Sequence, residues 1–288
     1  MAKADIAALL ALGAAFFIAI GNVMHQRSAQ EVTDEPVGNT TALFLRLLSD
    51  RQWWLGSGIA ALGFGLQAAA LGLGSVLLVQ ALLVTALLFA LPINARITGQ
   101  PVTRSQWLWA ALLAASVAVV VTVGNPTSGH QRGALEVWTT VVVVLAPVLV
   151  GCVIGARLLS GRPAAAVLLG VVSGSLWGLF AVLTKGVVDR LGRGLGAVLT
   201  APEFYVWAAV AVAATAWQQS SFRAGSLAAS LPTMTVTEPL VASVLGVFVL
   251  GETLRPGERG WALLVAAIAA MVVATVALAR SEAAPAHR

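Results

Sequence analysis

One acidic residue inside a long apolar stretch is the main chemical signal of this sequence. Glu238, directly followed by Pro239, lies near the middle of Ser226–Thr253, which is dominated by apolar and small residues. A helix of that length crosses a hydrocarbon core of about 30 Å. An acid in lipid costs roughly 2.5–3.5 kcal/mol, so we expect Glu238 to face protein or a water-filled cavity. Pro239 removes a backbone donor and loosens the helix beside it.

Four hydroxyl-bearing residues precede the acid. Ser226, Ser230, Thr233 and Thr237 follow the spacing i, i+4, i+7, i+11, which places them on one helix face. Burial disfavours the ionised form of a carboxyl, so Glu238 could exchange a proton for a cationic or zwitterionic cargo. The plainer interpretation is that the hydroxyls bond to their own backbone and that Glu238 only ties helices together.

Other polar and aromatic side chains in the apolar runs extend the candidate cargo site. Glutamines could line a cavity or bond at the interface, and large aromatics in membrane helices usually serve as packing or interface anchors. Lys185 and His25 stand at helix ends, where such side chains snorkel. The candidate substrate-binding residues are Glu238, Thr237, Thr233, Ser230, Gln218, Gln219, Gln67, Gln80, Trp177, Phe17 and Asn22.

Composition indicates a polytopic membrane protein. Of 288 residues, 59% are hydrophobic and 10% are charged, against about 25% charged in soluble domains. Because Lys and Arg are scattered singly between apolar runs, the net charge of +5 does not indicate a nucleic-acid partner. The single cysteine, Cys152, excludes a disulfide framework within one chain. The sequence has no phosphate loop, HExxH or Ser/His/Asp set, so we expect neither an enzyme nor a cofactor or metal centre.

The apolar runs predict an all-α bundle of about nine transmembrane helices. In the polar connection after the first helix, residues 42–51 form a short amphipathic segment that we expect at the interface. Gly170, Gly174 and Gly178 form a small-xxx-small face that favours close helix contact. The expected helices are Asp5–Met24, Trp53–Leu71, Ser75–Ala95, Trp107–Val123, Val137–Leu159, Ala164–Val187, Phe204–Ser221, Ser226–Thr253 and Gly260–Ala279.

An internal repeat organises these helices. Residues 67–75 (QAAALGLGS) align with 218–226 (QQSSFRAGS), 99–100 (GQ) with 251–252 (GE), and 13–21 (GAAFFIAIG) with 174–182 (GSLWGLFAV). An offset of five helices makes the two units inverted, a common symmetry of secondary transporters. We predict a first repeat at 1–124, a linking transmembrane helix at 125–162, a second inverted repeat at 163–280 and a disordered tail at 281–288. Leu87 aligns with Glu238 and Gln100 with Glu252, so the acids occur in one repeat only.

Two segments carry a family resemblance. TEPLVASVLGVFVLGETL (Thr237–Leu254) resembles the "E-P-aliphatic … lgE" segment of EamA-type members of the drug/metabolite transporter superfamily. WWLGSGIAALGFGLQAAALGLGSVLLVQALLVTALLFAL (Trp53–Leu91) is similar to the magnesium-transporter-like NIPA branch and its bacterial relatives. The resemblance runs from about Ile6 to Ala279, and nine helices fit the NIPA branch better than the usual ten of EamA members. It implies two inverted bundles around a central cavity with alternating access.

These observations predict a secondary transporter in the inner or plasma membrane, proton-coupled through Glu238, that exports or takes up a small metabolite, drug-like cation or ion. More Lys and Arg on the side opposite the amino terminus favours a cytoplasmic carboxyl terminus and an outside amino terminus. Three alternatives stay open: a flippase for a lipid-linked or polyprenyl-phosphate cargo, a Mg²⁺ transporter, and a non-transporting scaffold for a partner protein. Membrane lipid, a second copy of the chain and a membrane protein are the further partners considered.

Overall fold

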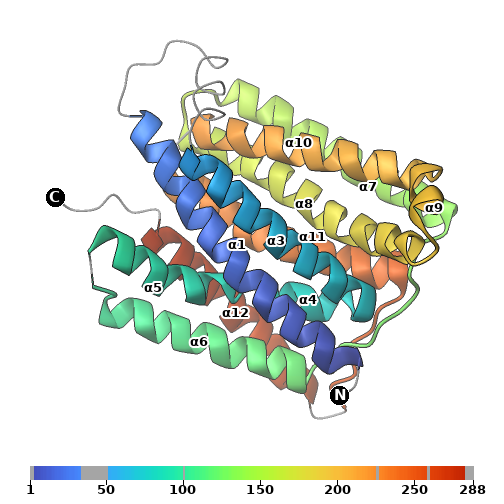
Figure 1. The fold of residues 1–288 in the computed structure, drawn as a ribbon. Helices are drawn as coiled ribbons and strands as arrows, with labels where there is room; N and C mark the ends of the chain where they lie inside the picture. The colour runs from blue at the N-terminus through green and yellow to red at the C-terminus, as the bar shows by residue number, and fades with distance from the viewer. Residues whose placement is uncertain (1–2, 34–50, 100, 225–226, 258–259, 283–288) are drawn as a thin grey trace.

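The chain forms a bundle of helices, shown in Figure 1. The computed structural model describes residues 3–33, 51–99, 101–224, 227–257 and 260–282. The helices are α1 (Lys3–Thr33), α3 (Arg51–Leu73), α4 (Val76–Leu83), α5 (Ala86–Thr98), α6 (Arg104–Thr122), α7 (Leu135–Leu158), α8 (Pro163–Leu191), α9 (Leu195–Leu199), α10 (Pro202–Ala224), α11 (Leu227–Leu250) and α12 (Gly260–Glu282).

The predicted all-α polytopic architecture is confirmed. Among the described residues, eight segments are long and apolar enough to cross a membrane, with α4 and α5 together making one of them. The helix α10 has 23 residues and is long enough to cross a membrane. It is not among the eight spans, and residues Gln218 to Ser221 make its carboxyl-terminal end polar. It nevertheless packs along α8, as the other long helices pack along one another.

Several helix bounds differ from the prediction. The first helix continues to Thr33, and α12 continues to Glu282, so the first two residues of the predicted tail are helical. The short helix α9 was not predicted. Of the predicted interfacial segment 42–51, only Arg51 is described, and it begins α3. The rest of that segment, and 283–288 of the tail, lie outside the described residues.

The predicted helix Ser75–Ala95 is interrupted. Its two parts, α4 and α5, are separated by Val84 and Thr85. At the break, the Thr85 N–H donates to the Leu82 carbonyl at 3.0 Å, and the Thr85 hydroxyl donates to the same oxygen. The hydroxyl therefore competes with the regular helical ladder for this carbonyl, as threonine side chains do inside helices. The result is a half-helix, α4, in which every residue from Val76 to Leu82 is buried.

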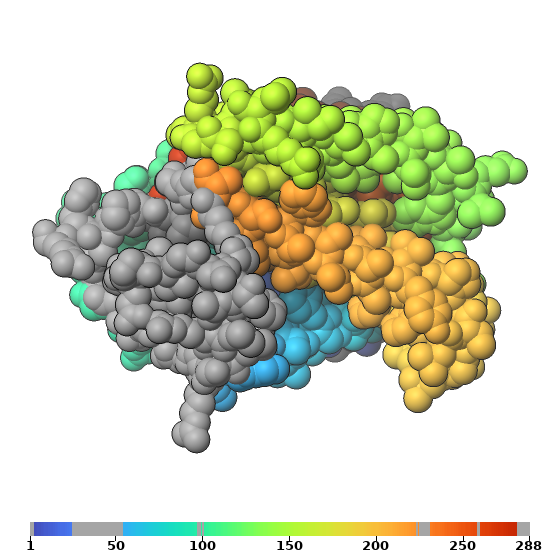
Figure 2. Space-filling view, turned by 90° about the horizontal axis from the view of Figure 1, so that it is seen from above, coloured from blue at the N-terminus to red at the C-terminus, as the bar shows by residue number. Residues whose placement is uncertain are grey.

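The same pairs of helices pack in both halves of the chain. In the first half, α1 packs along α3 and contacts α4 and α5; in the second half, α8 packs along α10 and contacts α11. Contacts of α3 with α8, α4 with α11, and α6 with α12 join the halves. Two related repeats would pack in this way, and their exact boundaries stay a prediction. The linking helix α7 lies along one edge of the bundle, green in Figure 2, and exposes apolar side chains such as Val143 and Val144.

One end of the bundle gathers four connections, and we call it the amino-terminal face. The start of α1 lies there beside the α3–α4 connection, because a Cβ on Gly74 would come within 2.8 Å of Ala7 Cβ. The connections α6–α7, α8–α10 and α11–α12 lie at the same end, and the carboxyl terminus lies at the other (Figure 1).

Candidate functional site

The helix α8 packs closely on α11 at the predicted acid. A Cβ on Gly174 would lie 2.9 Å from Thr237 Cβ and 3.2 Å from the Glu238 nitrogen, and one on Gly178 would lie 2.7 Å from the Glu238 carbonyl oxygen. Heavy atoms essentially never approach a real Cβ to less than 3.0 Å, so the contacts of 2.9 and 2.7 Å require glycine at both positions. The structure thus places the predicted glycine face of α8 directly against the Thr237–Glu238 backbone.

Glu238 itself is half-buried inside the span Leu231–Leu250. In the part of the chain that the structure describes, its carboxyl makes no hydrogen bond and no ion pair. Pro239 follows it within the helix, and Pro232 lies two turns earlier. A membrane helix therefore carries an acid with no partner among the described residues, at a point where two prolines weaken its backbone ladder.

The hydroxyls near the acid have mixed roles. The neighbouring Thr235 bonds to its own backbone, donating to the Leu231 carbonyl at 2.8 Å. Thr237 and Thr233 are half-buried on the same helix. The side chains of Ser226 and Ser230 lie outside the described residues.

Two of the predicted amides are buried in the first half. Gln67 on α3 is 4% exposed and Gln80 on α4 is 1% exposed. The side-chain nitrogen of Gln80 is buried and has no hydrogen-bond partner in the part of the chain that the structure describes. Buried amide nitrogens are nearly always satisfied in proteins, so an orphan of this kind marks a place where water or a ligand belongs. Gln80 lies one helical turn before the Val84–Thr85 break.

The remaining candidates are spread over the bundle. Gln218 is half-buried on α10, whereas Gln219 and Asn22 are exposed. Trp177 stacks on Phe64 of α3 with ring centroids 5.6 Å apart and meets Phe180 edge-on. Phe180 continues this aromatic row by stacking on Trp207 of α10. Phe17 packs edge-on against Phe16. Trp177 is therefore part of the packing between helices, whereas this contact of Phe17 lies within α1.

The structure reveals a buried ion pair that the sequence analysis missed. Lys185 was expected to snorkel, but its side chain is 0% exposed and its Nζ donates to Glu252 Oε1 at 2.7 Å. Glu252 also accepts the backbone N–H groups that begin α4: Val76 N lies 2.8 Å from Oε1 and Leu77 N lies 3.0 Å from Oε2. The side chain of His25, the other residue expected to snorkel, lies outside the described residues.

A glycine turns Glu252 into the bundle. Gly251 ends α11 with a left-handed φ of 64°, and its N–H donates to the Val247 carbonyl, as in a helix end closed by an αL residue. Gly246 leaves room for the carboxylate, because a Cβ there would lie 3.1 Å from Glu252 Oε2. Two features of the sequence could have predicted the pair. Lys185 lies inside a predicted membrane span, and Glu252 directly follows Gly251, a residue that commonly ends a helix.

The α6–α7 connection is tied to the α11–α12 connection around this pair. Thr127 and Thr253 form an antiparallel bridge, and the His130 N–H donates to the Leu250 carbonyl at 2.6 Å. From the same connection, Arg132 pairs with Asp189 near the end of α8. Backbone bonds and ion pairs thus join the connections at the amino-terminal face.

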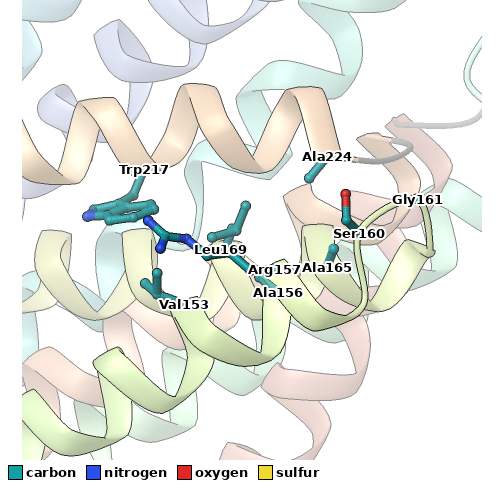
Figure 3. Close-up of a pocket in the computed structure, with 9 residues that line it drawn as sticks. All are labelled: Val153, Ala156, Arg157, Ser160, Gly161, Ala165, Leu169, Trp217 and Ala224. Carbon is teal, nitrogen blue, oxygen red and sulfur yellow. The ribbon is translucent and has the colours of Figure 1, made fainter.

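A pocket of about 220 Å³ lies toward the opposite end, between α7, α8 and α10. Arg157 and Trp217 reach into it from α7 and α10 (Figure 3), and apolar side chains such as Val153 and Leu169 form much of its wall. Glu238 does not line it. This pocket combines one exposed cation with an apolar lining beside the exposed helix α7.

Comparison with known proteins places the chain in a family. It is 36% identical, over 282 residues, to an uncharacterized protein of Corynebacterium glutamicum, with 98% of this chain and 97% of the relative aligned. The chain belongs to the same family as this corynebacterial protein. No family model matches the chain, and no solved structure matches it. Within the described residues, no group of three or more His, Cys, Asp or Glu side chains could hold a metal ion.

Proposed function

We propose that this protein is a secondary transporter of the drug/metabolite type that moves a small metabolite, drug-like cation or ion by alternating access. The observation that carries the proposal is the contact of two weakened membrane helices, the interrupted α4–α5 and the proline-containing α11. Discontinuous helices at a repeat interface are where secondary transporters place their substrate and coupling-ion sites.

Each of these helices supplies a polar group that has no hydrogen-bond partner among the described residues. Gln80 contributes a buried amide nitrogen and Glu238 a carboxyl inside the span. A cargo with a cationic or hydrogen-bonding group would satisfy both kinds of side chain, and proton binding at Glu238 would couple its movement to a pH gradient. We place the protein in the inner or plasma membrane, with the amino-terminal face outside and the carboxyl end in the cytoplasm.

Transport by purified protein in proteoliposomes tests this function. The panel holds amino acids, quaternary amines, polyamines, nucleotide sugars and Mg²⁺, each with and without a pH gradient. We expect uptake of one class to depend on the pH gradient, and to lose that dependence in Glu238→Gln. Glu136→Gln is the matched control, because Glu136 is an exposed acid in the first turn of α7. Absence of uptake across the panel by correctly folded protein would refute small-cargo transport.

The pocket between α7, α8 and α10 favours a second candidate, a flippase for a lipid-linked or polyprenyl-phosphate cargo. Its Arg157 could pair with a phosphate while the apolar wall holds a chain. Scrambling of a fluorescent lipid phosphate in proteoliposomes, compared between the native protein and Arg157→Gln, distinguishes this candidate. Equal rates with protein and with empty vesicles would exclude it.

A further inference from the structure

Glu252 makes a contact that joins the two halves of the bundle at the amino-terminal face. Its carboxylate accepts the N–H groups of Val76 and Leu77 from the first half, and the ammonium of Lys185 from the second half. We call this arrangement the α4 clamp. We propose that the α4 clamp is the gate that closes the amino-terminal face in the transport cycle; this inference rests on the proposed function.

The side chains of the α4 clamp are shielded from water. Both charged side chains are 0% exposed, and Val76 is also fully buried. The Thr127–Thr253 bridge and the His130 bond to Leu250 tie the flanking connections together over this region. In the proposed cycle, a hydrated cargo cannot pass between α4 and Glu252 while these bonds hold, and the structure corresponds to the state in which this gate is closed.

The distribution of its bonds allows the clamp to open without separating the buried charges. Lys185 and Glu252 both belong to the second half, so their ion pair can move as a unit. Of the three bonds that the Glu252 carboxylate accepts among the described residues, two come from the first half, from the N–H groups of Val76 and Leu77 at the start of α4. Leu78 N–H is independently satisfied by the Ser75 hydroxyl at 3.1 Å. On opening, water entering the face can bond the two released N–H groups, whereas splitting the ion pair would leave buried charges uncompensated.

The repeat has no charged counterpart of the clamp. By the alignment of the two halves, Gln100 stands at the position of Glu252 and Met24 at the position of Lys185. The corresponding half-helix start would be that of α11 at Leu227. Because only one of the two positions carries a charge pair, we expect the amino-terminal face to be the more firmly closed of the two ends.

The test replaces the clamp with the neutral residues of the other half. Lys185→Met combined with Glu252→Gln leaves no buried charge unpaired, so the double variant should fold where either single change destabilises the protein. Arg190→Gln combined with Glu203→Gln is the matched control. It removes an ion pair at the same face that lies wholly within the second half, between the end of α8 and the start of α10.

Two readouts follow the gate without requiring a cargo. Hydrogen exchange of a peptide containing Val76 and Leu77 should become about tenfold faster in the clamp variant, because a hydrogen bond to a charged acceptor is lost. Spin labels at Leu73→Cys and Arg255→Cys, in a Cys152→Ala background, should give a second and longer distance in the clamp variant only. Both label positions are exposed, beside α4 and in the α11–α12 connection respectively.

The possible results separate the gate from the function. Unchanged exchange and unchanged distances in the folded clamp variant would overturn the gate, whatever the protein transports. If the clamp variant opens and also changes the uptake rate of the identified cargo, the gate is supported. If it opens but the native protein transports nothing in the panel, the proposed function fails, and with it the assignment of this opening to a transport cycle.

Discussion

Two acids near the same helix, Glu238 and Glu252, have opposite surroundings. Glu252 lies past the end of α11 and receives three donors from Lys185, Val76 and Leu77. Glu238 lies inside α11 and, among the described residues, receives none. A carboxylate with its partners in place holds a structure together, whereas one without partners is free to bind a proton or a cargo. Under the proposed function, Glu252 therefore holds helices together and Glu238 is the acid that would bind a proton or cargo.

The largest loss of stability should come from removing the cation that pairs with Glu252. Lys185→Met alone leaves the Glu252 carboxylate buried without its cation, which typically costs about 3–5 kcal/mol. We expect a strongly lowered melting temperature and poor yield in detergent. Adding Glu252→Gln should recover most of the loss. A single variant as stable as the native protein would show that Glu252 is not held as an anion here.

The next effect concerns the contact that positions Glu238. In Gly178→Val the new Cβ would lie 2.7 Å from the Glu238 carbonyl oxygen, forcing α8 and α11 apart. Overpacking of this kind costs about 1–3 kcal/mol, and thermal unfolding measures it. Gly151→Val on α7 is the control, because nothing lies within 4 Å of a Cβ there. Equal melting temperatures for the two variants would contradict the close packing of α8 on α11.

A smaller effect is expected for Trp207→Phe. This change keeps the aromatic stack but removes the hydrogen bond of 2.9 Å from the indole N–H to the Thr184 hydroxyl. Thr184 directly precedes Lys185 in the sequence. The loss of one such bond costs about 0.5–1.5 kcal/mol. Thermal unfolding should therefore shift modestly, and less than in Lys185→Met; a larger shift would mean that Trp207 supports the α4 clamp.

The smallest stability change should come from the acid without partners. Glu238→Gln removes no bond that the described residues make, and the amide has nearly the same shape. We expect a change within about 0.5 kcal/mol, as for substitutions that disturb no packing or pairing. In the same preparation, pH-dependent uptake should be lost. Marked destabilisation would instead mean that Glu238 ties helices together.

The sequence predicted the features that depend on local pattern. Apolar runs predicted the helices, and the spacing of Gly174 and Gly178 predicted the close face that meets α11 at Glu238. The α4–α5 break was missed because neither Val84 nor Thr85 is a usual helix breaker; a single side-chain hydroxyl marks the interruption. The ion pair was missed because its members are 67 residues apart and each stands near a helix end, where lysine and glutamate are ordinarily solvated.

The α4 clamp also has a consequence for biogenesis. The N–H groups that begin α4 are made early, but their acceptor, Glu252, lies 176 and 175 residues later in the chain. The bridge between Thr127 and Thr253 likewise pairs an early segment with a late one. During membrane insertion, the start of α4 therefore has to bond to water until α11 and Glu252 have been made. The first half synthesised alone therefore lacks the acceptor that holds the start of α4 in the complete protein.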